Sequence, residues 1–455
     1  MIPADPPAPA GDDDGEALLD EVENAGPSPD DEDRDVDSLM MQGLTLLARE
    51  NYGQAEARFR AVLVKDPRRS KAHLGLGRIL ETRYKTELAI LHFQTASAID
   101  PANAEAFRCL GDAYLALGKS APALAAYARA LRVDAKHALA HYHEALALLA
   151  SGKYARGWRG YEWRWRVPGA PERKLVAPAW DGKARTNAAG TPLNLLVEGE
   201  GAGVEAILCL HSFADLMASG VRASFCGDGG VGTLLHRSYP NLEIVAAEAP
   251  TTPFDAAIPL GSLPGHLRRR PVEFTHAAGY LVADLRATTT WRERYRARGA
   301  GLKLGLAWRG EASWPARDPA RLPLAALGPV FDLPGFDFAS LEPEPSAVIE
   351  AHGQVPQDRL GHWPGAADLD ALAARIDGCD LVVAPPGRIA ALAGALGKKV
   401  FVLAPTPAGW PWLMRGRKLP WFPSAVVLRR QADQDWEKPI AALAAELRAL
   451  QNSAG

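Results

Sequence analysis

Cysteines are few in this sequence of 455 residues, and long apolar runs are absent. The four cysteines lie far apart and form no Cys-x-x-Cys pair, which argues against a zinc site or a disulfide framework. They are Cys109, Cys209, Cys226 and Cys379. No apolar run is long enough to span a membrane, and no basic-then-apolar leader opens the chain. We therefore expect a cytoplasmic protein without a metal, a cofactor, or a membrane or nucleic-acid partner.

Basic residues are almost missing from the first 35 residues, where 13 acidic side chains and six prolines accompany a single basic residue, Arg34. Such a segment cannot bury enough apolar surface to offset its ordering entropy, so we expect residues 1–35 to form a disordered acidic tail. We interpret it as a solvating segment; a decoy for a basic surface is the alternative.

A period of 34 residues begins near residue 36. A glycine, an alanine, an aromatic residue and usually a proline recur at matching positions. The three sets are Gly43, Ala55, Phe59 and Pro67; Gly77, Ala89, Phe93 and Pro101; and Gly111, Ala123, Tyr127 and Ala135. This spacing is typical of tetratricopeptide (TPR) repeats, in which small residues let paired helices approach and aromatic residues wedge between repeats. The pattern predicts three clear repeats and one degenerate repeat over residues 36–166.

The first helices of TPR pairs line a concave groove, which makes a protein client the expected partner of this half. The predicted groove residues are Lys71, Arg78, Glu81, Glu105, Arg108 and Asp112. Their mixed charge suits a polar peptide, and a merely solvated face is the alternative.

The last repeat ends in an aromatic segment, residues 157–165, which contains three tryptophans and a tyrosine. We expect it to pack the array against the next domain; a stacking platform for a sugar or base is the alternative. Three nearby histidines, His137, His141 and His143, lack further metal ligands in the pattern, so packing and surface roles are favoured over a metal site.

From about residue 190, short apolar runs alternate with helical stretches. The expected strands are 193–198, 222–226 and 242–246, then, after a break near 285–300, 303–308, 336–341, 380–384, 399–404 and 425–428. This alternation predicts parallel sheets in two Rossmann-like halves that face a cleft, with ligands at the carboxyl ends of the strands. The glycine spacing at 199–203 is not G-x-G-x-x-G, so a redox dinucleotide site is not expected.

Several segments together resemble the bacterial TPR–glycosyltransferase family, GT-B proteins related to O-GlcNAc transferases and heptosyltransferases. They are GWRGYEWRW (157–165), WDG (180–182), PLGSLP (259–264), LAWRG (306–310), SLE (340–342), LAGALG (392–397), WPWLMR (410–415) and PWFP (420–423). The resemblance implies a TPR solenoid followed by a GT-B pair of Rossmann-type halves, at residues 167–300 and 301–450. It also implies sugar transfer without a metal, and some family members modify flagellin.

The chain departs from the family at polar site positions. Where the family enters its LAGALG helix through Asp-Thr-x-x-x-His, this sequence has Pro386, Gly387 and Ala391. The family's groups grip the diphosphate of the donor, and none of these side chains is present here. The family loop Glu-Gln-Gly-Leu-Gly-Asp is here residues 199–204, and Val204 replaces its final acid. These departures indicate a retained fold with weakened or lost activity.

Retained donor binding is the counter-hypothesis, because an arginine in the first turn of the helix could hold phosphate itself. The nucleotide-sugar residues would then be Gly201, Gly203, Arg309, Gly387 and Arg388. Further candidates for the same cleft are Asp318, Arg321, Arg415 and Arg429. No catalytic residue is assigned.

Three functions remain open from the sequence. The first is an accessory or regulatory protein that binds its partner through the TPR repeats and carries a degenerate glycosyltransferase-like domain. The family resemblance suggests flagellin modification or flagellum biogenesis as its setting. The second is an active protein O-glycosyltransferase that uses a nucleotide sugar. The third is a peptide-binding adaptor whose C-terminal domain only stabilises the array.

Overall fold

A computed structural model describes residues 29–246, 253–274, 279–310, 321–342, 359–363, 365–366, 368–431 and 434–454. Four antiparallel helix pairs form its N-terminal part, which confirms the predicted repeats. The pairs are α1 (Pro29–Ala48) with α2 (Tyr52–Lys65), α3 (Ser70–Thr82) with α4 (Thr86–Ile99), α5 (Ala104–Ala116) with α6 (Ser120–Val133), and α7 (Ala138–Ala150) with α8 (Tyr154–Tyr161). Helix α1 begins at Pro29, inside the segment expected as tail, and residues 1–28 of that tail lie outside the described residues.

The glycines of the repeats are explained by the aromatic rings that face them. A Cβ atom on Gly77 would lie 2.3 Å from the Phe93 ring, and one on Gly111 would lie 2.4 Å from the Tyr127 ring. Both rings are completely buried. The 34-residue period therefore arises because each of these helix pairs leaves no space for a Cβ atom opposite its buried aromatic ring.

The first α/β half contains a four-stranded parallel sheet of strand order β3-β2-β1-β4. Its strands are β1 (Asn194–Glu198), β2 (Arg222–Cys226), β3 (Glu243–Val245) and β4 (Ala256–Pro259). The helices that accompany it are α9 (Val204–Cys209), α10 (Phe213–Ala218), α11 (Gly229–Ser238) and α12 (Leu263–Leu267). The three strands expected here are confirmed, and β4 is an addition.

The second half contains a six-stranded parallel sheet of order β10-β9-β8-β5-β6-β7. Its strands are β5 (Leu302–Leu306), β6 (Phe336–Ser340), β7 (Leu360–Gly361), β8 (Leu381–Ala384), β9 (Lys399–Ala404) and β10 (Ala425–Arg429). Its helices include α14 (Gly328–Phe331), α16 (Leu369–Asp377), α17 (Arg388–Ala395) and α18 (Glu437–Ala454). The order is that of the Rossmann fold, and its switch point lies between β5 and β8.

The expected break near 285–300 is instead occupied by a helix, α13 (Leu285–Arg296), which packs on α16. Only Thr288 and Tyr295 of this helix are buried, so its sequence lacks a continuous apolar stripe. No helix among the described residues is long and apolar enough to cross a bilayer.

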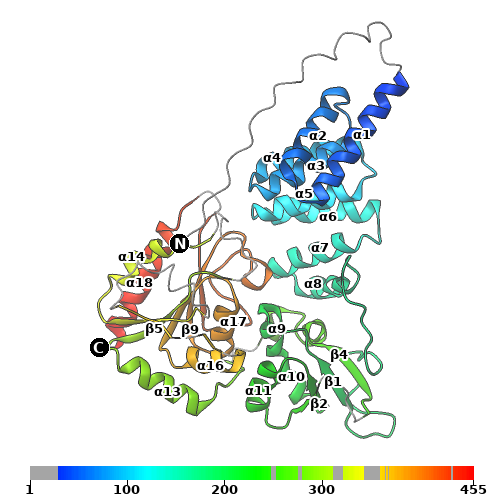
Figure 1. Cartoon of the computed structure of the whole chain (residues 1–455). Coiled ribbons are helices and arrows are strands. Elements are labelled where there is room, and N and C mark those ends of the chain that lie inside the picture. The colour runs from blue at the N-terminus through cyan, green and yellow to red at the C-terminus, as the bar shows by residue number, and fades with distance from the viewer. Residues whose placement is uncertain are drawn as a thin grey trace, which may run out of the picture.

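One hydrophobic core joins the three parts of the molecule. It runs from Leu149 and Trp158 at the end of the array, through Ile207 of the first half, to Ala391 and Trp410 of the second. In Figure 1 the array stands over the two α/β halves, with α7 and α8 nearest to them. The halves are thus packed against each other and against the last repeat, and a second core lies beneath α18 within the second half.

Candidate functional site

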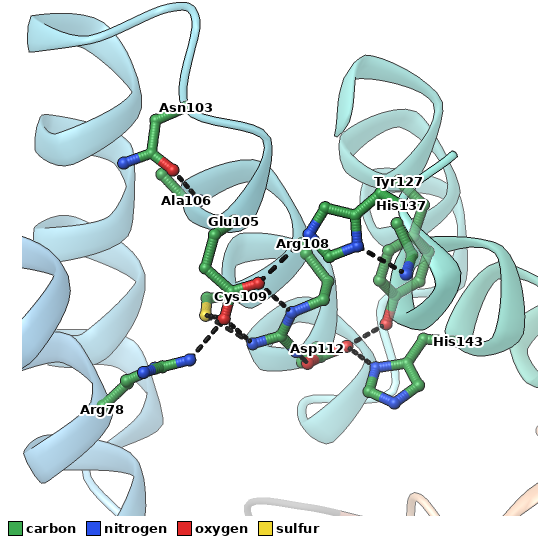
Figure 2. Close-up of polar contacts among 11 residues, drawn as sticks. Arg78, Asn103, Glu105, Ala106, Arg108, Cys109, Asp112, Tyr127, His137 and His143 are labelled. Carbon is green, nitrogen blue, oxygen red and sulfur yellow. Dashed lines mark hydrogen bonds and ion pairs between the residues drawn. The ribbon is translucent and has the colours of Figure 1, made fainter. Parts of the chain in front are cut away.

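The first helices of the repeats, on which the groove residues were predicted, carry a connected group of charged side chains (Figure 2). Arg78 of α3 pairs with Glu105 of α5, and Arg108 pairs with both Glu105 and Asp112 along α5. Arg108 is buried, and its Nη2 and Nε atoms lie 2.6 and 2.7 Å from the Glu105 carboxylate. The helix spacing of three and four residues puts these partners on one face of α5.

Two histidines from the next repeat complete this group, which we call the groove cluster. Nδ1 of His143 lies 2.7 Å from an Asp112 oxygen, and Nε2 of His137 lies 3.3 Å from Glu105. The Tyr127 hydroxyl donates a 2.7 Å hydrogen bond to Asp112. The groove cluster therefore comprises Arg78, Glu105, Arg108, Asp112, Tyr127, His137 and His143.

Sequence reasoning missed these two histidines as groove residues. The one available signal was their separation of about one repeat from Glu105 and Asp112, since equivalent positions of neighbouring repeats lie side by side. His141, by contrast, stacks on Trp163 with ring centroids 3.9 Å apart. Among the described residues, no group of three or more His, Cys, Asp or Glu side chains could hold a metal ion.

The remaining two predicted groove residues, Glu81 and Lys71, do not belong to the groove cluster. Lys71 is exposed, whereas Glu81 is partly buried in the last turn of α3. Among the described residues, neither side chain has a hydrogen-bond or ion-pair partner. Burial, followed by the charge of Asp112, raises the Glu81 pKa from its ordinary value of 4.5 to about 7.

Glu105 shows the opposite behaviour within the same groove. Burial alone would raise its pKa, but the hydrogen bonds and charge of Arg108, with the charge of Arg78, lower it to about 2. The two carboxyls differ because only Glu105 has guanidinium partners at bonding distance. Of these two carboxyls, Glu105 is held ionised by its ion pairs, whereas Glu81 has no ion-pair partner among the described residues.

The aromatic segment that follows the array packs into the joint between the three parts. The Trp158 ring contacts Tyr161 and Trp410 edge-on, and its Nε1 donates a 3.1 Å hydrogen bond to the Arg268 carbonyl oxygen. Trp158, Tyr161 and Trp410 are all buried. The packing role predicted for this segment agrees with these contacts.

The glycine-rich loop after β1 is tied to the end of the array. Two Arg164 nitrogens each lie 3.0 Å from the Glu200 carboxylate, which also accepts a 2.7 Å hydrogen bond from the Gly261 N–H. Gly201 has a φ of +90°, a conformation that favours glycine, and Gly203 caps α9. The one carboxylate of this loop is therefore already engaged by the protein itself.

The helix that would hold a donor diphosphate begins in a buried, apolar environment. Pro385, Pro386 and Gly387 are buried, and Ala391 is fully buried where the family has histidine. Helix α17 packs on α9 of the first half, and the N–H groups of Tyr280 and Leu281 both donate to the Ala395 carbonyl oxygen. Small side chains on α17 allow this close packing of the two halves.

The cationic candidates near the switch point share one sheet edge. Arg309 follows β5 and Arg388 follows β8, two adjacent parallel strands. Arg388 is exposed in the first turn of α17. The backbone N–H groups of Trp308 and Arg309 donate to one oxygen of the buried Glu342, at 2.7 and 2.8 Å.

The other residues predicted to line the cleft give less support to a binding site. Burial lowers the Arg429 pKa to about 10, and this side chain donates to the carbonyl oxygens of Trp412 and Gly416. Arg415 is exposed, Arg321 is partly buried, and Asp318 lies outside the described residues.

Comparisons with known proteins support the repeat array and give several relatives of the chain. The tetratricopeptide repeat family matches residues 40–104 and 110–157. Protein FlbA of Caulobacter vibrioides is 25% identical over 395 residues, which cover 79% of this chain and 64% of FlbA. The probable UDP-N-acetylglucosamine–peptide N-acetylglucosaminyltransferase SPINDLY of Arabidopsis thaliana is 36% identical over 92 residues, or 20% of this chain and 10% of SPINDLY. A solved mutant of Thermobaculum terrenum O-GlcNAc transferase is 16% identical and covers 92% of both chains with a TM-score of 0.34.

The chain thus combines a tetratricopeptide repeat array with two packed Rossmann-type α/β halves. The chain is similar to FlbA over most of its length and to SPINDLY over part of it. It spans less than two thirds of the length of FlbA.

Proposed function

We propose that this protein is a cytoplasmic accessory or regulatory protein that binds a protein client in its TPR groove. Its glycosyltransferase-like domain serves as a degenerate scaffold. The family resemblance suggests flagellin modification or flagellum biogenesis as the setting, with flagellin or a flagellar assembly factor as the client.

The observation that carries this proposal is the buried, apolar segment that leads into α17. Transfer from a nucleotide sugar needs donors and cations that compensate the charge of the departing diphosphate. Here two prolines without N–H groups lead into the helix, and Ala391 is buried where the family has histidine. The small, buried side chains of α17 pack the helix against the first half, so this packing needs no polar site.

Calorimetry with a panel of nucleotides and nucleotide sugars tests this proposal. We expect no binding in the micromolar range, because α17 offers too few polar partners for a diphosphate. Micromolar affinity for any of these ligands would contradict the degenerate role. Capture of clients from cells, with intact-mass analysis in the presence and absence of the gene, tests partner and modification together.

An active protein O-glycosyltransferase is the second candidate, and one observation favours it. Arg388 is exposed at the sheet edge that also carries Arg309, where ligands bind in Rossmann folds. In this version the Arg388 guanidinium compensates the leaving diphosphate and the groove presents the acceptor hydroxyl. Unchanged donor binding and transfer in Arg388→Ala would exclude it.

A further inference from the structure

The cations of the groove cluster are already neutralised by its own anions. Arg78 is paired with Glu105, and the buried Arg108 is shared between Glu105 and Asp112. An acidic client would therefore have to displace a formed ion pair before it could reach either guanidinium. Lys71 is exposed and hydrated, so a contact with it gains little.

Glu81, on the same helix as Arg78, is a partly buried carboxyl without an ion-pair partner among the described residues. It lies one turn after Arg78 on α3, and among the described residues nothing donates a hydrogen bond to it. The charged groups that act on it are Arg78 from its own helix and Glu105, Arg108 and Asp112 from α5. Both guanidinium groups are paired with other carboxylates, and their remaining attraction for Glu81 is outweighed by burial and by the repulsion of Asp112 and Glu105.

A partly buried carboxyl of this kind is costly to the free protein and gains most from a cationic partner. From this geometry we infer that the client of the TPR groove inserts a lysine or arginine side chain beside Glu81. The inference rests on the proposed client-binding function and names the chemistry of the segment that binds. On docking, the Glu81 carboxyl gives its proton to the solvent and the carboxylate pairs with the client cation.

A library of short random peptides displayed on phage and selected on the full-length protein tests this assignment, because such a selection does not require the client to be identified. The wild type is expected to enrich sequences with a lysine or arginine at one fixed position. Glu81→Gln should lose that preference, whereas Glu87→Gln, the same change at an exposed site on α4, should keep it. Circular dichroism checks that each variant is folded.

The possible outcomes distinguish the Glu81 assignment from the more general proposal that the TPR groove binds a client. Enriched peptides without a fixed basic residue, or with a fixed acidic one, overturn the Glu81 assignment and leave client binding intact. A preference that survives Glu81→Gln also overturns it. No enrichment of any peptide by the folded protein overturns client binding in the groove and the assignment together.

Calorimetry with one selected peptide then measures how many protons are released on binding. At pH 7, a carboxyl with a pKa near 7 is half protonated, so about half a proton per complex should be released, visible as a heat that differs between phosphate and Tris buffers. We expect Glu81→Gln to bind about tenfold more weakly and to release no proton. A lysine-to-glutamine peptide should bind both proteins equally. Equal proton release by wild type and Glu81→Gln would refute the pairing.

Discussion

Glu81 also gives the free protein a distinctive pH dependence. Its pKa is about 7 in the folded protein and close to the ordinary 4.5 when unfolded, so between these values the folded state binds more protons. The contribution of Glu81 to stability therefore falls as the pH rises from about 4.5 to about 7, and this contribution is constant outside that range. A shift of that size corresponds to about 3 kcal/mol, and the water in an open groove reduces it to about 1–2 kcal/mol.

Replacing Glu81 with glutamine removes this penalty while keeping the shape of the protonated carboxyl. We expect Glu81→Gln to match the wild type near pH 5 and to exceed its unfolding free energy by about 1–2 kcal/mol near pH 8. Urea unfolding followed by circular dichroism at three pH values measures the difference. Glu87→Gln, on the exposed first turn of α4, is the matched control and should show no such trend. A difference for Glu81→Gln that is independent of pH would refute the reasoning.

Four other substitutions test the packing and the groove cluster. Gly111→Ala places a methyl group 2.4 Å from the Tyr127 ring and should destabilise the array by about 1–3 kcal/mol, whereas Gly53→Ala, in open space on α2, should stabilise it by about 0.5–1 kcal/mol in thermal unfolding. Trp158→Ala should lower the unfolding free energy by about 3–5 kcal/mol and separate the single calorimetric unfolding transition into two. A single transition at an unchanged midpoint would contradict a core shared by the array and the α/β halves. Glu105→Gln leaves the buried Arg108 with Asp112 as its carboxylate partner in place of two carboxylates, and it should lower the unfolding free energy by about 3 kcal/mol at neutral pH. The difference should shrink as the pH falls from about 4.5 toward 2, and a constant difference would argue against the paired carboxylate.

The helix pairs could be predicted from the sequence because each depends on local constraints that repeat. Gly77 must face Phe93, and the same requirement recurs 34 residues later. The strands buried on both faces were likewise visible as short apolar runs. Strand β4 was not, since Ala256–Pro259 holds two alanines and a proline and has little strand propensity of its own.

The partners within the groove could not be predicted in the same way. The six predicted residues follow from their positions in the repeat, but their pairing depends on distances across repeats. Asp112 meets His143, 31 residues away, through the packing of α5 against α7. Whether Glu81 is paired or unpaired is decided by the direction of two guanidinium groups, and no pattern in the sequence encodes that direction.

The aromatic joint has a practical consequence for anyone who shortens this chain. Repeat arrays normally end in a helix with a polar outer face that keeps the last unit soluble. Here Tyr154, Trp158 and Tyr161 of α8 are covered by the α/β halves instead, so those halves act as the terminal cap. A fragment that stops near residue 166 would expose this aromatic surface and is expected to aggregate, unless the three side chains are first replaced by polar ones.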